Sequence, residues 1–238
     1  MNLLDLALIV VIAVSVLLGA YRGFVVSALK TASFFVSWIL AYLLHPLLSW
    51  AMSGQGMMQT LINYTEGAAK LPYDTPLAMI TTPITQVDAA TLNNLVNNSS
   101  LVSPFGKLVK SNIASQAFAS QGLTTVGDYF NYTVAYATLN IITFLILFLV
   151  FRIICGVIIN ATDATHKFPV LRHNDVLAGS LTGLLRGVFV CYIVMTLAPV
   201  ALSILNVPVV TDYVLSAPLA GFFYKSNFIL LLMRGKVF

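Results

Sequence analysis

The sequence predicts an all-α polytopic membrane protein, with about four transmembrane helices in two hairpins. Of its 238 residues, 59% are apolar and only 8% are charged, whereas a soluble domain carries about 25% charged residues. Several apolar runs approach or exceed the roughly 20 residues that a helix needs to cross a bilayer. One long polar stretch divides these runs into two groups, which predicts two membrane hairpins joined by an extramembrane segment.

The first hairpin is predicted over residues 1–50. Leu3–Ala20 is an apolar run interrupted only by Asp5 and Ser15. No basic residue precedes it, so we expect a retained first span rather than a cleavable signal peptide. The segment Tyr21-Arg22-Gly23 breaks this run, and a second apolar run, Phe24–Leu44, ends at His45-Pro46. Because the break is so short, the two spans should be antiparallel.

Residues 51–132 differ in character. They are rich in Asn, Gln, Ser, Thr, Gly and Pro, and weak helical periodicity occurs at Leu61–Lys70 and Lys107–Gln121. A structureless stretch of this length would be unusual. We therefore predict a polar, partly helical extracytoplasmic insertion.

The second hairpin is predicted over residues 133–207. Val134–Phe151 is the third span, and its extension to Ile159 is left open. The polar loop Asn160–His173 precedes a fourth apolar run, Val176–Val207. That run is longer than one straight span requires. It is therefore strongly tilted, kinked at Pro199, or opened by a half-helix before the crossing.

Residues 208–238 form the last segment. Its apolar run Phe228–Met233 is too short to cross a bilayer and is followed by Arg234 and Lys236, which is typical of an interfacial helix. Basic residues in short loops mark the cytoplasmic side. Arg22 and Arg172 place both short turns in the cytoplasm, so the N-terminus, the long loop and the C-terminus should be extracytoplasmic. The basic residues of the tail argue for the opposite orientation.

A glycine stripe organises the fourth run. Gly179, Gly183 and Gly187 are four residues apart, so on a helix they share one face, against which another backbone can pack. Two interpretations stay open: packing within one chain, or a glycine-zipper seam between the subunits of a homo-oligomer. Gly19 and Gly23 belong to a similar G-x-x-R-G motif near the N-terminus, which reflects either an internal duplication or chance.

Four charged residues lie in or beside the apolar runs, and such residues are functional candidates by default. Asp175 would cap the glycine helix together with Asn174, pair with Arg22, or do both. Arg186 would reach toward Asp5, a hydroxyl group of the second or third span, or a water-filled cleft. Alternatively, its side chain extends to the lipid headgroups because the true span begins after it.

Other classes of function find no support in the sequence. The formal net charge of +4 is too diffuse for a nucleic-acid-binding surface. The three histidines are not at metal-ligand spacing, and no G-x-S-x-G motif occurs. Cys155 and Cys191 fall inside apolar runs, where packing is the better interpretation. We therefore predict no catalytic, cofactor-binding or metal-binding site, and a protein that is not an enzyme.

Two stretches resemble a known family. Asn2-Leu3-Leu4-Asp5 followed by G-x-x-R-G-F at Gly19–Phe24 looks like the start of the colicin V production protein (CvpA) family. The run N-D-x-L-A-G-x-x-x-G-L-L-R-G at Asn174–Gly187 resembles the signature ahead of that family's last span. Val176 stands where the family usually has Arg, so any ion pair made by that arginine is absent here. The resemblance does not cover most of 51–132.

The resemblance implies a multi-pass protein of the bacterial inner membrane that takes part in toxin (colicin V-like) production or export, or in envelope homeostasis. Two hypotheses follow. The first is a non-enzymatic scaffold or accessory factor whose partners are the lipid bilayer, other envelope proteins and further copies of itself. The second is a small transporter or channel, with Asp5, Arg22, Asp175 and Arg186 around a polar cleft.

Overall fold

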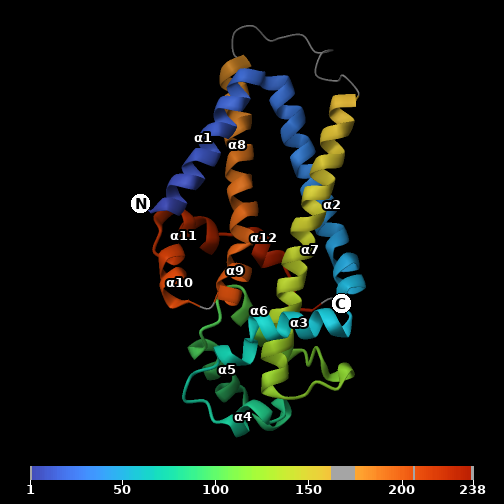
Figure 1. The fold of residues 1–238 in the computed structure, drawn as a ribbon, viewed down its shortest axis with the longest axis vertical. Helices are drawn as coiled ribbons and strands as arrows, with labels where there is room; N and C mark the ends of the chain where they lie inside the picture. The colour runs from blue at the N-terminus through green and yellow to red at the C-terminus, as the bar shows by residue number, and fades with distance from the viewer. Residues whose placement is uncertain (1, 162–174, 206, 237–238) are drawn as a thin grey trace. The chain divides into compact units, whose positions relative to one another are not determined.

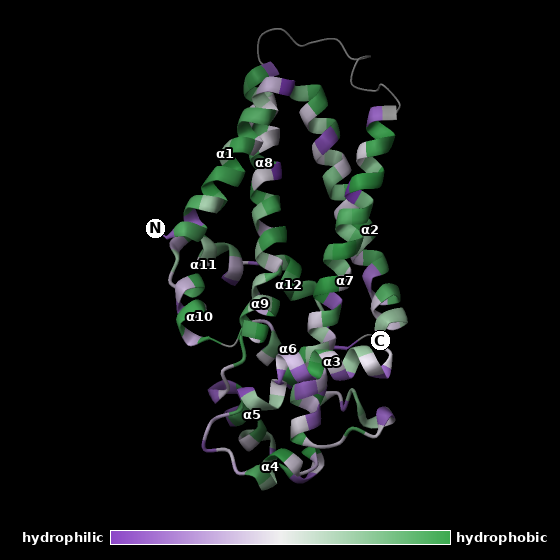
Figure 2. Cartoon of the chain, viewed as in Figure 1, coloured by the Kyte–Doolittle hydropathy of each residue, from purple (hydrophilic) through white to green (hydrophobic). Residues whose placement is uncertain are grey.

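The computed structural model describes residues 2–161, 175–205 and 207–236. These residues form helices, turns and loops without a strand, apart from one isolated bridge between Pro83 and Thr125. Four helical segments are long and apolar enough to cross a membrane, and Figure 2 shows their hydrophobic character. The all-α polytopic fold is therefore confirmed. The segments are α1 (Leu3–Arg22), α2 (Phe24–Met52), α7 (Val126–Ala161), and α8 (Asp175–Thr196) with α9 (Ala198–Leu205).

The chain divides into two compact units. The first comprises Met1–His45, Phe144–Thr196 and Pro208–Ile229; the second comprises Pro46–Thr143, Leu197–Val207 and Leu230–Phe238. Within the first unit, α1 packs lengthwise along α8 (Figure 1). Rings on α2 contact α7 and α8: Phe34 meets Phe148 of α7 with centroids 5.2 Å apart, and Phe35 meets Phe189 of α8 at 4.6 Å.

Helix α2 continues through Pro46 to Met52, past the predicted end of the second run. A proline inside a helix removes one hydrogen bond to the carbonyl group four residues earlier, which here belongs to Tyr42. Nδ1 of His45 lies 2.7 Å from the Tyr42 carbonyl oxygen and satisfies this acceptor. The His-Pro pair, read from the sequence as the end of a run, is thus accommodated within the helix.

Helix α7 begins at Val126, before the predicted start of the third span. A reciprocal pair of hydrogen bonds starts it: Asp128 N–H donates to the Thr125 hydroxyl group at 3.1 Å, and Thr125 N–H donates to the Asp128 carboxylate at 3.0 Å. This capping box lies in the polar segment, outside the two stretches of that segment in which helical periodicity occurs. The helix continues past Arg152 to Ala161, so the open extension to Ile159 is realised.

The fourth run is interrupted at Leu197, between α8 and α9 and close to Pro199, but Asp175–Leu205 still counts as one candidate span of 31 residues. Proline fits the first turn of a helix because the N–H group that it lacks would have no partner there. The polar loop predicted at 160–173 lies almost entirely outside the described residues, as does Asn174.

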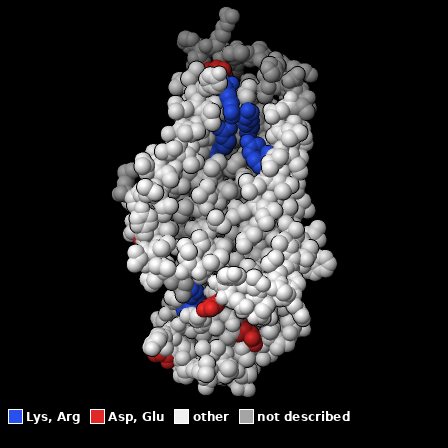
Figure 3. Space-filling view, in the orientation of Figure 1, with Lys and Arg blue, Asp and Glu red and all other residues white. Residues whose placement is uncertain are grey.

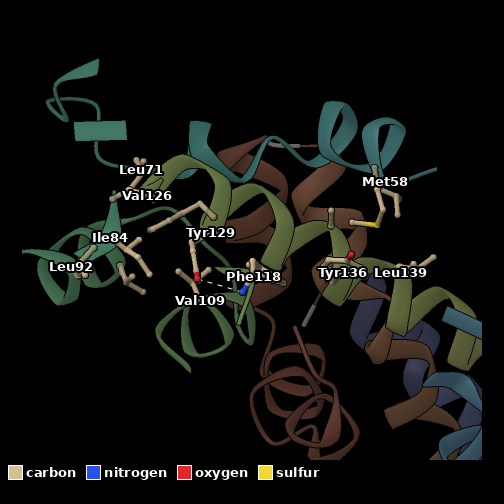
Figure 4. Close-up of a cluster of buried hydrophobic side chains, with 14 residues drawn as sticks. Met58, Leu71, Ile84, Leu92, Val109, Phe118, Val126, Tyr129, Tyr136 and Leu139 are labelled. Carbon is tan, nitrogen blue, oxygen red and sulfur yellow. Dashed lines mark hydrogen bonds between the residues drawn. The ribbon is translucent and has the colours of Figure 1, made fainter. Parts of the chain in front are cut away.

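The second unit contains most of the polar insertion, which is partly helical as predicted. Its helices are α3 (Gln55–Thr65), α4 (Leu77–Thr81), α5 (Ala89–Asn98) and α6 (Phe105–Ala114), with three short 3-10 segments. A buried cluster holds them together (Figure 4), with Phe118, Tyr129 and Val109 fully enclosed. Phe118 N–H donates to the Tyr129 hydroxyl group at 3.4 Å, so even this aromatic core is partly hydrogen-bonded.

The tail forms three short helices rather than one: α10 (Pro208–Leu215), α11 (Pro218–Lys225) and α12 (Phe228–Leu232). The chain bends by 91° between α10 and the two that follow. Asp5 on α1 accepts hydrogen bonds from the N–H groups of Leu219 and Ala220, at 3.0 and 3.1 Å. These backbone groups at the start of α11 have no partner within that helix, so the Asp5 carboxylate ties the tail to α1.

Candidate functional site

The glycine stripe lies against α1 of the same chain. A Cβ atom added to Gly179 would collide with the Gly19 carbonyl oxygen, and one added to Gly183 would collide with the Ser15 carbonyl oxygen. Glycine is needed at these positions because the two backbones touch. The structure thus realises the intrachain interpretation: the face that would form a seam between subunits is already covered by α1.

Ser15 is the polar centre of this contact. Its hydroxyl group donates to the Gly183 carbonyl oxygen at 2.8 Å and accepts from Nε of Arg186 at 3.2 Å. Nη2 of Arg186 also donates to the Ser15 carbonyl oxygen, at 3.4 Å. The Arg186 side chain is only 8% exposed. The sequence predicted a hydroxyl partner for Arg186 on the second or third span, whereas Ser15 belongs to α1, the first span.

Three arginines meet at one pocket of about 540 Å³ in the first unit. Arg22 comes from the end of α1, Arg152 from α7 and Arg186 from α8. Nη1 of Arg152 donates to the Ser33 hydroxyl group of α2 at 3.0 Å. Lys30 of α2 interacts electrostatically with all three arginines. In Figure 3, Lys and Arg side chains gather in a hollow on one face.

The walls of this arginine pocket are otherwise mainly apolar. Four apolar side chains come from α1, and one each from α2, α7 and α8. The apolar lining residues are Val10, Val11, Val14, Leu18, Phe34, Phe148 and Val190. The pocket therefore combines a cationic part with an apolar surface.

Within the described residues, no carboxylate neutralises these cations. Among the residues that the structure describes, neither Asp5 nor Asp175 lines the pocket, and no ion pair joins Arg22 or Arg186 to an acid. The predicted pairs Asp175–Arg22 and Asp5–Arg186 are therefore wrong for the described chain. Both acids instead accept hydrogen bonds from backbone N–H groups, which have no competing partner at helix starts.

Asp175 caps a different helix from the one expected. Its carboxylate accepts from the N–H group of Phe24, the first residue of α2, at 2.5 Å. The same carboxylate lies against Gly23, where φ is +75° and a Cβ atom would collide with it. Asp175 thus starts α2 across the α1–α2 turn. The predicted cap of α8 by Asp175 together with Asn174 includes a residue that lies outside the described ones.

Sequence reasoning missed Arg152 and Lys30 as members of the site. Arg152 directly follows the predicted third span, Val134–Phe151, and Lys30 lies within the second apolar run, Phe24–Leu44. The signal was nevertheless the one that singled out Arg186, a cation within an apolar run. It did not show that four such cations on different helices converge.

Comparison with known families identifies the chain. The sequence model of the colicin V production protein family matches residues 4–108 and 108–226. The chain belongs to the colicin V production protein family. The matched residues include all of 51–132, so the polar segment belongs to the family's own region, contrary to the resemblance seen in the motifs alone. No curated protein and no solved structure matches the chain.

In this colicin V production family member, the arginine pocket can hold an anion. Guanidinium groups present five N–H donors in a planar fork that suits phosphate and carboxylate groups. A cationic pocket without its own carboxylate attracts a negatively charged group from outside, and low-dielectric walls strengthen the attraction. Among the described residues, no group of three His, Cys, Asp or Glu side chains could hold a metal ion.

Proposed function

We propose that this protein is a non-enzymatic component of the bacterial inner membrane that takes part in toxin production or export, or in envelope homeostasis. We further propose that it works by binding an anionic group in the arginine pocket. Membership of the colicin V production family supports the context. The observation that carries the proposal is the meeting of Arg22, Arg152 and Arg186 at one pocket that no acid of the described chain lines.

Charged side chains inside a membrane protein usually pair with one another or line a functional path. Arg152 and Arg186 each have only serine oxygen atoms as hydrogen-bond acceptors among the described residues. A purely structural role would be better served by a carboxylate partner, because an uncompensated charge in a low-dielectric environment is costly. The cost is understandable if the missing negative charge belongs to a ligand.

We further propose that the end of the first unit that carries Arg22 faces the cytoplasm, with the N-terminus and the polar insertion on the other side. The support is the rule that basic residues of short loops stay in the cytoplasm. Arg22 ends α1 immediately before the turn at Gly23. Single-cysteine labelling from either side of the membrane, at Tyr21→Cys and at Tyr73→Cys, tests this orientation. Labelling of both from the same side would contradict it.

The functional proposal is tested by complementation in a bacterial strain that lacks its own member of this family. Arg152→Gln and Arg186→Gln should fail to restore growth under detergent stress, whereas Lys225→Gln should restore it. Lys225 is an exposed cation of the same unit that does not line the pocket, so it is the matched control. Full complementation by both arginine variants, at wild-type protein levels, would overturn the proposal.

A small transporter is the second candidate, because the pocket lies among helices from distant parts of the chain and holds a cationic surface. In this second candidate function the polar cleft is the arginine pocket, which neither Asp5 nor Asp175 lines. Reconstituted vesicles distinguish the two candidates: a transporter should move an anion down its gradient, and Arg186→Ala should abolish that flux while the protein still inserts. Unchanged flux in that variant would sink the transporter hypothesis.

A further inference from the structure

We propose that the ligand of the arginine pocket is the phosphate group of an amphiphile, such as a lipid phosphate, with its hydrocarbon chain against the apolar wall. This inference rests on the proposed function, because it names the class of anion that the pocket holds. Four features of the structure lead to it.

The first feature is the unbalanced charge. Lys30 and the three arginines interact with one another electrostatically, and like charges repel more strongly in a low-dielectric environment than in water. Asp5 and Asp175, the two acids that the sequence singles out, are engaged by backbone N–H groups. A phosphate group carries up to two negative charges on one centre, so it offsets this repulsion better than a single carboxylate.

The second feature is the number of donors. Each guanidinium group offers five N–H bonds. Arg186 directs Nε and Nη2 to Ser15, and Arg152 directs Nη1 to Ser33. In the described part of the chain, the other N–H groups of the three arginines have no protein acceptor. A guanidinium group can donate two parallel, charge-assisted hydrogen bonds to a pair of phosphate oxygens, which the compact ammonium group of a lysine cannot do.

The third feature is the wall. Val10, Val14 and Leu18 lie along α1 at helical spacing, and all three are more than one-third exposed. Phe34 and Phe148 close the far side with an edge-to-face contact. An inorganic anion would leave this surface without a partner, whereas a hydrocarbon chain would fill it and gain dispersion contacts.

The fourth feature is the absence of polar groups that would select a sugar, nucleotide or peptide. Ser15 is the only uncharged polar residue lining the pocket among the described residues, and its hydroxyl group already bonds Gly183 and Arg186. Such ligands would need donors and acceptors to recognise their own polar groups. A phosphate with an apolar tail needs neither.

Binding of dodecyl phosphate to the purified full-length protein in a neutral detergent tests the inference, with inorganic phosphate and dodecyl trimethylammonium as the other probes. Saturable binding of dodecyl phosphate alone is expected. Arg152→Gln should weaken it about tenfold or more, because a charge-assisted hydrogen bond contributes roughly 1.5–3 kcal/mol. Lys225→Gln should bind like the wild type. Arg186→Gln is a second variant, used if its thermal unfolding shows that it remains folded.

The outcomes separate the sources of the anion. If inorganic phosphate displaces dodecyl phosphate at equal concentration, the ligand is a soluble phosphate and the amphiphile is overturned. If dodecyl trimethylammonium binds equally well, the apolar wall alone is responsible and the anion site is overturned. If dodecyl phosphate does not bind although Arg152→Gln fails to complement, the lipid phosphate is overturned and the proposed function stands with another anion.

Discussion

Nε of Arg186 donates to the hydroxyl group of Ser15 at 3.2 Å, and through the same hydroxyl group α1 is tied to the glycine stripe of α8. The Ser15 side chain therefore takes part both in the packing of α1 against α8 and in the hydrogen bonding of Arg186 at the arginine pocket. The glycines bring α1 close enough for Ser15 to reach both the backbone of α8 and its arginine. The position of the guanidinium group thus depends on the helix contact beneath it.

Ser15→Ala should lower the stability of the folded protein by about 0.6–1.7 kcal/mol, the range measured for hydrogen bonds between membrane helices. The substitution also removes the acceptor of Nε of Arg186, so the affinity of the variant protein for an anionic probe should change. Ser180→Ala is the matched control, because its hydroxyl group bonds only within α8, to Val176. Thermal unfolding in detergent compares the stability of the two variants. Equal melting temperatures for the two variants would contradict the account of Ser15.

Gly183→Ala should destabilise the protein by about 1–3 kcal/mol, the usual cost of overpacking, because the new Cβ atom meets the Ser15 backbone. Gly183→Leu should fail to fold rather than yield a folded monomer. Gly156→Ala in α7 is the control, since nothing lies within 4 Å of a Cβ atom there. Size-exclusion profiles and unfolding in the same detergent compare them. A well-folded Gly183→Leu protein would contradict intrachain packing at the stripe.

Asp175→Ala should cost about 0.5–2 kcal/mol, the range for losing a helix cap, because Phe24 N–H loses its acceptor at the start of α2. The effect should appear as faster hydrogen exchange in the first turn of α2. Asp212→Ala removes an exposed acid of the same unit and should leave that exchange unchanged. Identical protection in the two variants would show that Asp175 does not cap α2.

The insertion offers a test by pH. Hydrogen bonds from the side chain and backbone of Thr91 lower the pKa of Asp88, which caps α5. A lowered carboxyl pKa means that the cap stabilises the helix above the unfolded value of about 3.9. Its contribution is lost as the pH falls through the lower, folded value. Protection of the first turn of α5, corrected for intrinsic exchange rates, should therefore fall below about pH 4.

Asp88→Asn provides the control for this prediction, because asparagine caps a helix nearly as well and does not titrate. In that variant the protection should not change over the same pH range. A pH-dependent loss of equal size in both proteins would assign the effect to another group.

The sequence predicted the fold more completely than the site. Apolar length gave the four spans, and the glycine spacing identified the close-packed face of α8. The partners of Arg186 and Asp175 could not be read in the same way, because they depend on which helices pack together. Pairing α1 with α8 puts Ser15, rather than Asp5, opposite Arg186. The start of α7 was missed because its capping box lies among polar residues.

Placing a carboxylate inside the arginine pocket tests the central claim most directly. Val14 lines the pocket and is 48% exposed, so Val14→Glu supplies a tethered anion, and Val14→Gln has the same size without the charge. We expect Val14→Glu to be folded, to lose dodecyl phosphate binding and to fail in complementation, whereas Val14→Gln, which alters the apolar wall without adding a charge, should bind more weakly than the wild type but still saturably, and should complement. A folded Val14→Glu protein that binds and complements like the wild type would contradict the claim that this pocket works by holding an external anion.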